Sequence, residues 1–548
     1  MDTEDKKHLP YQLLIIGALL LGFFPAILHV YLFHDDLFFW DQPASRHTFP
    51  LICSESIYLG RFLGAFICWS YFFIVKTVMD LNMIRLITSL VIAYCALRTY
   101  GLLLKYLKRP IDAALCAIML FSLPAFEVWV SHAGESFEVY ALFFAIMAGY
   151  SADRIPLEGH FWERTAGRAG LLSMASLICS WMIYPSLAGF YWALALVLIL
   201  AQRESESKGL RNKIWNIYIP GLAAAIFYAC IYKFRKYFIK LIFVSAYQPD
   251  TMTTDIPDKI LWFLGTVVPQ SLNLWNIFPD IILPSIFSLF FAGAVIIKLI
   301  DDGGKGKNNF WLRATAGFLI TVSLMILSYL PNLLVAINFN PYRCAAGLTA
   351  VFLIFLIWAL RVYCRYIPKP AGSIAFTLIL CVVCWWGISR CFNNIDHFRV
   401  KPSCLEYSFL RDSIVNFHGK LKEIDIIPPR FEGLYHYYDE FGVSTFEFNS
   451  SANVVRLMNA VITGTFVGEG MKWASYHHKP TYSYYFREPS GQKDQNYSLL
   501  KIRVVGYAKK DLPSSTLLID MNDLYAPLKQ AMGRQSDFKT LNKRSWDG

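Results

Sequence analysis

Eleven long apolar runs, separated by short polar loops, fill the first 390 residues of this 548-residue chain and constrain its fold more than any other feature. Each run holds about 15 to 22 residues, and about 20 apolar residues in a helix are enough to cross the hydrocarbon core of a bilayer. Charged residues make up 17% of the chain, against about a quarter in soluble domains. The sequence therefore predicts a mainly α-helical membrane protein with many spans. The predicted spans are residues 11–32, 85–104, 111–130, 137–152, 169–185, 187–201, 214–232, 281–299, 313–332, 343–362 and 372–390.

The segment 61–80 decides the predicted topology, because a further span here would reverse every later loop. Lys and Arg are concentrated in the cytoplasmic loops of membrane proteins. If 61–80 lies on or dips into the outer face, the inside loops hold about 19 Lys and Arg, and the short outer loops SHAGES and PNLLVAINFN hold none. We therefore predict a retained first helix with a cytoplasmic N-terminus, and an outer C-terminus. The same loops account for the net charge of +11 without a nucleic-acid partner.

The apolar runs stop after residue 391, which predicts two domains. Residues 1–391 are expected to form a multispan transmembrane domain, with an interfacial or broken helix over 263–280. Residues 392–548 are expected to form a soluble outer domain. The alternating stretches STFEFNS and LLKIRVVGYA within it are typical of strands, so we expect this domain to mix α and β structure.

Two adjacent aspartates, Asp35 and Asp36, follow the first span in the stretch YLFHDDLFFW. The predicted topology puts them at the outer membrane edge among aromatic residues. One carboxylate could accept a proton from a reacting hydroxyl group while its neighbour orients it. Alternatively, the pair caps a helix or begins a solvated loop, where Asp is common. We favour the functional interpretation because of the position directly after the first span.

The stretch HDDLFFW, followed some twenty residues later by SIYLGRFLG, resembles the GT-C superfamily of membrane glycosyltransferases. Within that superfamily, it is similar to the Gtr-type glucosyltransferases that modify bacterial O-antigen. Their first outer loop carries an acidic residue or pair, followed by a Gly-Arg that corresponds here to Gly60 and Arg61. Residue-level similarity covers about 30–65, and the layout of a multispan core with an outer C-terminal domain extends over the whole chain.

The resemblance implies a catalytic domain over 1–391 and an inverting transfer reaction at the periplasmic face of the bacterial inner membrane. It implies a polyprenyl-phosphate-linked sugar, glucose, as donor and a hydroxyl of a cell-surface glycan such as O-antigen as acceptor. Asp35 or Asp36 would then be the catalytic base, and the C-terminal domain would be periplasmic.

A lipid-phosphate leaving group lies at headgroup depth, and its negative charge calls for Arg or Lys at the same depth. Arg61 and Arg343 both lie there in the predicted topology, and Tyr342 stands beside Arg343. The outer segment YKFRKYFIK breaks the charge pattern of the loops, and its Lys233 and Arg235 are further candidates for binding the substrate. Snorkelling of these side chains at an interfacial helix is the alternative.

The short outer loop WVSHAGESFEVY offers His132, Glu135 and Glu138. Glu135 is a further candidate catalytic carboxylate, and His132 could help to position the acceptor. Glu138 is expected in the first turn of the next helix, where a carboxylate also complements the helix dipole. Together with Asp35 and Asp36, Glu135 and His132 would suit a divalent cation, magnesium or manganese. No spacing requires one, and we predict no structural metal.

Two other functions fit parts of the pattern. An O-antigen polymerase or ligase also handles lipid-linked glycans on the outer face, but relies on arginines in a large outer loop. A transporter or flippase for lipid-linked sugars would carry charges at mid-membrane on broken helices.

Overall fold

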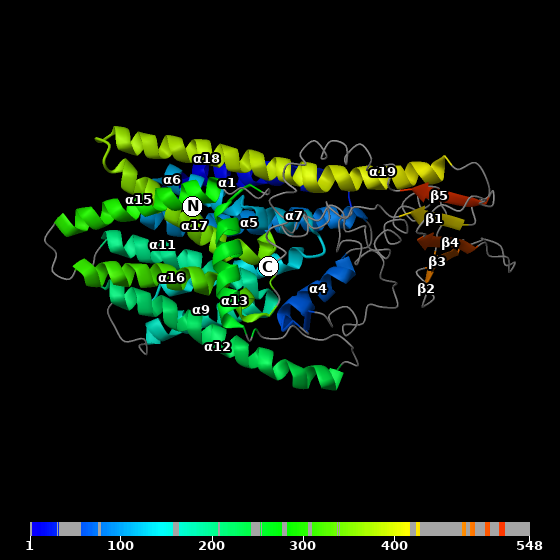
Figure 1. Cartoon of the computed structure of the whole chain (residues 1–548), viewed down its shortest axis with the longest axis horizontal. Helices are drawn as coiled ribbons and strands as arrows, with labels where there is room; N and C mark the ends of the chain where they lie inside the picture. Colours follow the sequence, from blue (N-terminus) through cyan, green and yellow to red (C-terminus); the bar gives the residue numbers. More distant parts are fainter. Residues whose placement is uncertain are drawn as a thin grey trace. The chain divides into compact units, whose positions relative to one another are not determined.

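The computed structural model describes residues 3–29, 31, 56–57, 59–74, 78–156, 164–205, 209–242, 253, 255–276, 282–304, 310–336, 338, 340–416, 423–427, 474–477, 483–487, 499–504 and 515–520. The described residues of Met1–His29 and Ser45–Phe398 pack into one compact unit, which is helical (Figure 1). Those of Arg399–Asp439 and Ser444–Gly548 pack into a second unit.

The first unit is built from helices because its long apolar segments can satisfy their backbone hydrogen bonds internally, as lipid requires. Several of them begin with a proline in the first turn, where a missing N–H costs nothing. The helices are α1 (Thr3–Leu28), α4 (Phe62–Ile74), α5 (Val78–Leu107), α6 (Pro110–Phe121), α7 (Pro124–Ser131), η2 (Ser136–Glu138), α8 (Val139–Asp153), α9 (Arg164–Ile183), α10 (Pro185–Ala188), α11 (Phe190–Ser205), α12 (Leu210–Ile242), α13 (Ile256–Trp262), η3 (Phe263–Val267), α14 (Val268–Leu272), α15 (Ile282–Gly304), α16 (Phe310–Leu334), η4 (Tyr342–Ala345), α17 (Ala346–Cys364) and α18 (Ala371–Ile395).

Eight helices among the described residues are long and apolar enough to cross a membrane. They contain Lys7–Leu28, Asp80–Leu107, Pro185–Gln202, Leu210–Phe234, Ile282–Asp301, Ala314–Leu334, Tyr342–Cys364 and Ala371–Ile395. The pair α6 and α7 would make a ninth span. The predicted spans 137–152 and 169–185 correspond to α8, which has 15 residues, and to α9, whose apolar part is Gly167–Ile183. The multispan architecture is confirmed in outline, and the count of eleven is not.

The helical segment 111–130 bends in its middle. Helices α6 and α7 meet at an angle of 60°, and Pro124 begins α7. A proline cannot donate the backbone hydrogen bond that would continue α6 and its ring clashes with the preceding turn, which explains the bend. All residues of α7 are buried, so the bend directs this short helix through the interior of the first unit.

The segments predicted as interfacial are short. Helix α4, within 61–80, has 13 residues, about 20 Å of helix and too short to cross a bilayer unaided. The predicted broken helix over 263–280 begins within a run of three helical segments, α13, η3 and α14. The middle one of these three segments, η3, is a π-helical turn. Such turns usually interrupt an α-helix only locally.

The junction of α10 and α11, at Gly189, approaches α16 and α17 through backbone atoms. A Cβ atom at Gly189 would lie 2.1 Å from the carbonyl oxygen of Ser328. One at Gly347 would lie 2.6 Å from the carbonyl carbon of Gly189. Glycine at both positions therefore permits the contact between these helices, as small residues do in membrane bundles.

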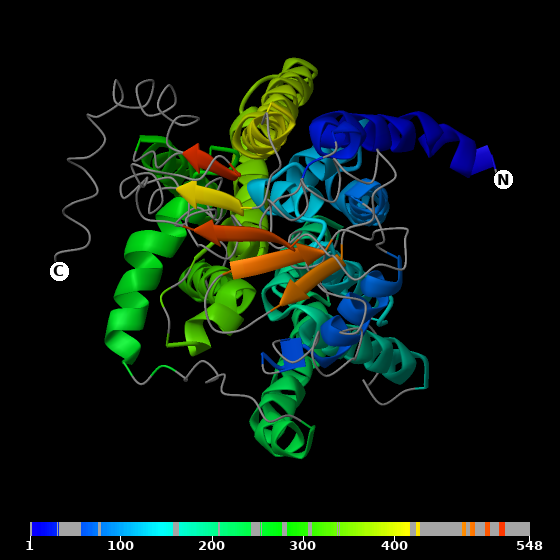
Figure 2. The same ribbon diagram turned by 90° about the vertical axis from the view of Figure 1, so that its right-hand side faces the viewer.

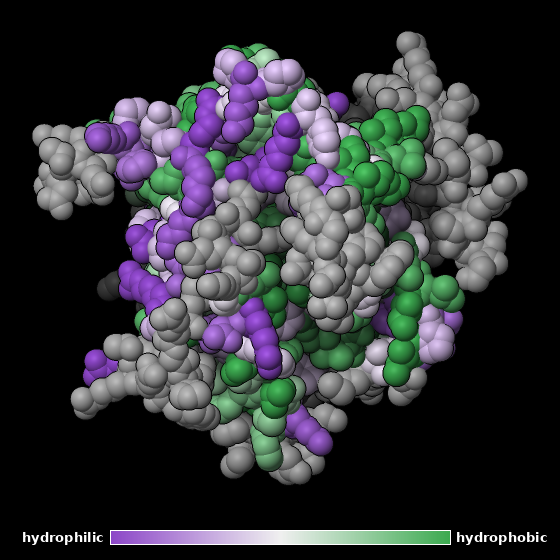
Figure 3. All heavy atoms as spheres, turned by 90° about the vertical axis from the view of Figure 1, so that its left-hand side faces the viewer, coloured by the Kyte–Doolittle hydropathy of each residue, from purple (hydrophilic) through white to green (hydrophobic). Residues whose placement is uncertain are grey.

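Long helices joined by short connections alternate in direction, so α7, α9 and α16 finish at the same end of the first unit at which α8 and α17 begin. We call it the site end. At the opposite end, the Asp153 carboxylate pairs with Lys105 and with Lys213, which joins α8 to α5 and α12. Figure 3 looks onto this opposite end, where hydrophilic side chains gather. The orientation of the two ends in a membrane stays a prediction.

The second unit contains α19 (Lys401–Val415), which follows the π-helical η5 (Asp396–Val400), and a five-stranded sheet. The strand order is β2 (Ala474–His477), β3 (Ser483–Arg487), β4 (Leu499–Val504), β1 (Glu423–Ile427) and β5 (Thr516–Asp520). Figure 2 shows the strands side by side in this order. Strand β1 is parallel to β4 and β5, and β2, β3 and β4 are antiparallel. Most of 392–548 lies outside the described residues, so a soluble periplasmic domain over this range stays a prediction.

Candidate functional site

The two aspartates on which the sequence prediction centred, Asp35 and Asp36, lie outside the described residues. The remaining candidates of the first unit can be placed, with the exception of one side chain. They come from the loop after α7, from η4, from the residue before α4 and from α12.

The loop between α7 and α8 is buried although it carries several polar side chains. His132, Glu135 and Glu138 have exposed fractions of 6%, 9% and 2%. Backbone hydrogen bonds from Ser136 N–H to the Ala133 carbonyl (3.3 Å) and from Glu138 N–H to the Glu135 carbonyl (3.0 Å) fold the loop into tight turns. Turns of this kind bring side chains three residues apart to the same side, so the loop presents an imidazole and two carboxylates together.

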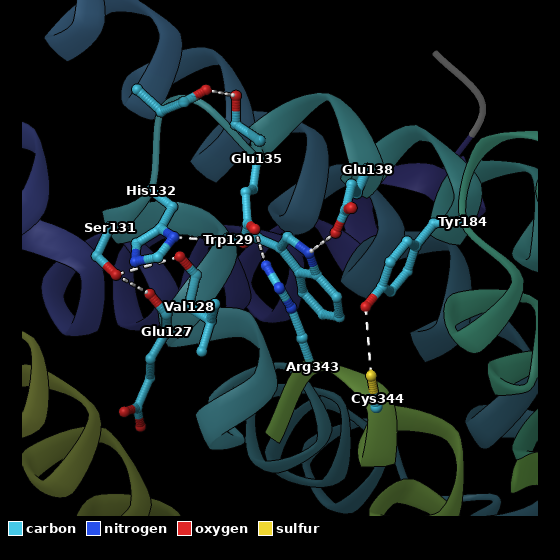
Figure 4. A network of polar contacts seen from close by, with 12 residues as sticks. Glu127, Val128, Trp129, Ser131, His132, Glu135, Glu138, Tyr184, Arg343 and Cys344 are labelled. Atoms are coloured by element: carbon cyan, nitrogen blue, oxygen red, sulfur yellow. Dashed lines mark hydrogen bonds and ion pairs between the residues drawn. The ribbon is translucent and has the colours of Figure 1, made fainter. Parts of the chain in front are cut away.

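The Glu135 carboxylate is bound from two sides. Its Oε1 forms an ion pair with Arg343 of η4, and its Oε2 lies 3.3 Å from His132 Nδ1. Figure 4 shows the Arg343 side chain reaching up from η4 to this carboxylate. The pair is partly accessible, with side-chain exposures of 25% for Arg343 and 12% for Glu135.

The Glu138 carboxylate is held more deeply. Arg61 Nη1 donates to its Oε1 at 2.9 Å, and Trp129 Nε1 donates to its Oε2 at 3.0 Å. The side chain of Glu138 is 3% exposed and that of Arg61 is 24% exposed. The Arg61 guanidinium also lies over the Tyr184 ring, 4.5 Å from its centroid, an arrangement in which cation–π attraction adds to the ion pair.

Tyr184 contacts both Arg61 and η4, the short helix that carries Arg343. Its hydroxyl lies 3.4 Å from the sulfur of Cys344, the residue after Arg343 (Figure 4). The network therefore links α7, the following loop, η4 and the residue preceding α4. It groups two arginines with two carboxylates and an imidazole.

Burial and neighbouring charge reinforce the protonation states that two of these groups ordinarily have at neutral pH. Burial by itself lowers the pKa of Arg61, but the Glu138 carboxylate and the nearby Tyr184 more than offset this and raise the pKa above its usual value. Burial, together with Cys344 and Glu138, raises the pKa of Tyr184 well above its usual value. At neutral pH the network thus holds a permanent cation at Arg61 and an uncharged phenol at Tyr184.

Gly60 positions Arg61 at the start of α4. Its φ of +77° lies in the left-handed region, which glycine adopts without strain. A Cβ atom here would also lie 2.9 Å from both the Tyr228 hydroxyl and the Tyr232 ring of α12. The backbone conformation thus explains why the first residue of the Gly-Arg pair, Gly60, is a glycine.

The Gly60→Ala substitution is expected to destabilise the first unit by about 1–2 kcal/mol, because alanine resists a left-handed backbone and meets two tyrosines. Unfolding of the purified protein in detergent measures this. Gly17→Ala is the matched control: no heavy atom lies within 4 Å of a Cβ atom at Gly17 in α1, so its stability should be unchanged or raised. Equal stability of Gly60→Ala and the unaltered protein would contradict the prediction.

The other candidates lie apart from the network's contacts. Tyr342 is buried beside Arg343, but its hydroxyl donates to the Asn276 carbonyl oxygen at 3.0 Å, which fixes η4 rather than presenting the hydroxyl to a ligand. Lys233 is exposed near the end of α12, one residue after Tyr232. The side chain of Arg235 lies outside the described residues.

Three members of the network were missed by the sequence prediction: Trp129, Tyr184 and Cys344. Trp129 and Tyr184 stand at the ends of apolar runs, where Trp and Tyr are common in membrane proteins. That signal indicates where these two side chains lie along the membrane normal, but it does not indicate which residues they contact. Nothing in the sequence distinguishes Cys344 from the other cysteines in apolar runs.

The described residues do not include a group of three His, Cys, Asp or Glu side chains that could hold a metal ion. The set of side chains that would suit magnesium or manganese also includes Asp35 and Asp36, which lie outside the described residues, so the structure does not test the prediction that no structural metal is bound.

Neither a family model nor a curated protein sequence matches the chain.

Proposed function

We propose that this protein is a membrane glycosyltransferase. It would transfer a sugar, glucose by the resemblance in the first outer loop, from a polyprenyl-phosphate donor to a hydroxyl of a cell-surface glycan such as O-antigen. The reaction would take place at the periplasmic face of a bacterial inner membrane. The main support is the meeting of Arg61 and Arg343 with the two glutamates of one buried loop at the site end.

This arrangement suits a substrate with a phosphate at headgroup depth. Guanidinium groups bind phosphate oxygens through two parallel hydrogen bonds and keep their charge at all physiological pH values. A cation beside the departing lipid phosphate would stabilise the negative charge that develops as the bond to the sugar breaks. The Arg343–Glu135 pair is more exposed than the Arg61–Glu138 pair, so Arg343 is the better placed of the two arginines to bind the lipid phosphate.

The acceptor hydroxyl needs a base. In the mechanism that we propose, Asp35 or Asp36 removes the hydroxyl proton, and the oxygen attacks C1 of the sugar from the side opposite the phosphate. The lipid phosphate leaves as the new glycosidic bond forms, and the configuration at C1 inverts. Glu135 and His132 would help to orient the acceptor.

The decisive experiment uses the purified full-length protein in proteoliposomes with a polyprenyl-phosphate donor carrying radiolabelled glucose, and O-antigen polysaccharide as acceptor. We expect label in the glycan as single side-branch glucose residues, and release of polyprenyl phosphate in equal amount. Label that stays on the lipid under all conditions would contradict the proposal. A change in glycan chain length, without side-branch glucose, would indicate a polymerase or ligase.

A second candidate is transport of a lipid-linked sugar, because several ionisable residues are buried within the helices of the first unit. Asp112 accepts from Thr377 at 2.6 Å, and Glu127 accepts from Asn394 at 3.2 Å. Charged groups inside membrane helices often mark substrate pathways. The same proteoliposomes distinguish the two functions: a transporter moves the intact labelled donor between leaflets without chemical change.

A further inference from the structure

The two arginine–glutamate pairs of the site are held differently. Glu138 has a hydrogen-bond donor on each oxygen, Arg61 and Trp129, and is 3% exposed. Glu135 is four times as exposed, at 12%, and its second partner is the imidazole of His132 at the longer distance of 3.3 Å. The Arg343–Glu135 pair is therefore the more open of the two.

We propose that Glu135 is an internal anion that occupies Arg343 while no ligand is bound, and that a phosphate group displaces it. Arg343 then exchanges a carboxylate of the chain for the phosphate of the ligand. The inference rests on the proposed function for the identity of that ligand, the phosphate of a polyprenyl carrier. Its test is a binding measurement that requires no catalysis.

Charge and geometry both permit the exchange. The phosphate of the sugar-bearing donor is a diester with one negative charge and two free oxygens, so it can replace a carboxylate at the guanidinium one for one. Polyprenyl phosphate, the monoester that leaves, carries between one and two negative charges at pH 7 and offers three oxygens. The Arg343 side chain is 25% exposed, so a ligand can reach it. Glu138 does not exchange in the same way, because its side chain is 3% exposed, against 12% for Glu135, so a ligand has less access to the pair that it forms with Arg61.

The displaced Glu135 would keep its contact with His132, because that contact uses Oε2 and the pair with Arg343 uses Oε1. Phosphate binding would thus release one carboxylate oxygen while the imidazole still holds the other. The side chain that shields Arg343 in the empty protein becomes available at the site only once the donor is in place. Donor binding would then precede any role of Glu135 in orienting the acceptor.

The Glu135→Gln variant tests this inference through the direction of its effect. Glutamine keeps the shape of the side chain but loses the charge that competes with phosphate. We expect polyprenyl phosphate to bind the full-length variant about 1.5- to fivefold more tightly than the unaltered protein, the range for removal of a partly exposed competing ion pair. Arg343→Gln should bind it more weakly. Glu138→Gln, the matched control, should not bind it more tightly.

Binding is measured in detergent with three probes: polyprenyl phosphate, inorganic phosphate and the uncharged polyprenol. Tighter binding of both phosphates by Glu135→Gln supports the exchange and shows that the phosphate group is sufficient. Tighter binding of polyprenyl phosphate alone supports it and shows that the lipid chain is needed. Tighter binding of polyprenol, or unchanged or weaker binding of polyprenyl phosphate, overturns the inference.

A second variant covers the case in which Glu135→Gln does not fold. Glu135→Asp keeps the charge but shortens the side chain, which weakens the pair with Arg343, so it should also bind polyprenyl phosphate more tightly, though by less. The two proposals fail separately. Sugar transfer by the unaltered protein with no gain in binding by Glu135→Gln refutes the exchange alone, and tighter binding without any sugar transfer refutes the glycosyltransferase alone.

Discussion

Glu138→Ala should destabilise the first unit by about 3 kcal/mol, because it leaves the Arg61 guanidinium without its counter-ion and Trp129 without its acceptor. This value is at the low end of the range for breaking a buried pair, since water reaches the Arg61 side chain, which is 24% exposed. Chemical unfolding of the purified protein in detergent measures the loss. Stability equal to that of the unaltered protein would show that the pair does not hold the site together.

A double-mutant cycle measures the interaction energy between Arg61 and Glu138 separately from the contacts that each makes with other residues. Replacing both partners, as Arg61→Met with Glu138→Met, removes the two charges together, so the double variant should regain much of the stability that either single variant loses. If Arg61 also binds the lipid phosphate, sugar transfer should stay low in the double variant despite its recovered stability. Recovery of both properties would restrict Arg61 to a structural role.

Asp35→Asn and Asp36→Asn should have the largest effect on rate. A well-placed general base contributes about 10²- to 10⁴-fold, so one of the two substitutions should lower kcat for sugar transfer by that amount. The other should lower it less if its carboxylate orients the base. The measurement is transfer of labelled glucose from a polyprenyl-phosphate donor at saturating donor and acceptor.

Two controls accompany this prediction. Unfolding in detergent should be unchanged in both variants, and so should the binding of polyprenyl phosphate, because the base acts on the acceptor. If the aspartates act as a unit, the double variant should be about as slow as the slower single one. A loss of less than tenfold in each variant would rule out a catalytic role for the pair.

The sequence predicted the long helices well where composition alone decides them. The predicted spans 343–362 and 372–390 lie close to α17 (Ala346–Cys364) and α18 (Ala371–Ile395). Both runs are strongly apolar and are bounded by polar or basic residues. The predicted span 137–152 also lies close to α8 (Val139–Asp153). The bend at Pro124 was not predicted, because a hydropathy pattern records how apolar a segment is and not how it is packed.

The candidate site was predictable in its components but not in its pairings. Loop position and charge singled out Arg61, Glu135, Glu138 and Arg343. Arg61 and Glu138 are 77 residues apart in sequence, and Tyr184 and Cys344 are 160 apart. Which arginine meets which glutamate depends on how the helices pack around the site end, and a single sequence contains no local signal of that packing.

The glycine contacts of the junction of α10 and α11 with α16 and α17 affect how motion would reach the site. Flexible side chains between two helices can adjust and absorb a small shift, but the contact at Gly189 and Gly347 is made by main-chain atoms, which have no such freedom. Gly347 follows Arg343 by four residues, and Gly189 follows Tyr184 by five. If one of these helices tilted, the Arg343 guanidinium and the Tyr184 phenol would therefore move with it, because no flexible side chain lies at this contact to absorb the shift.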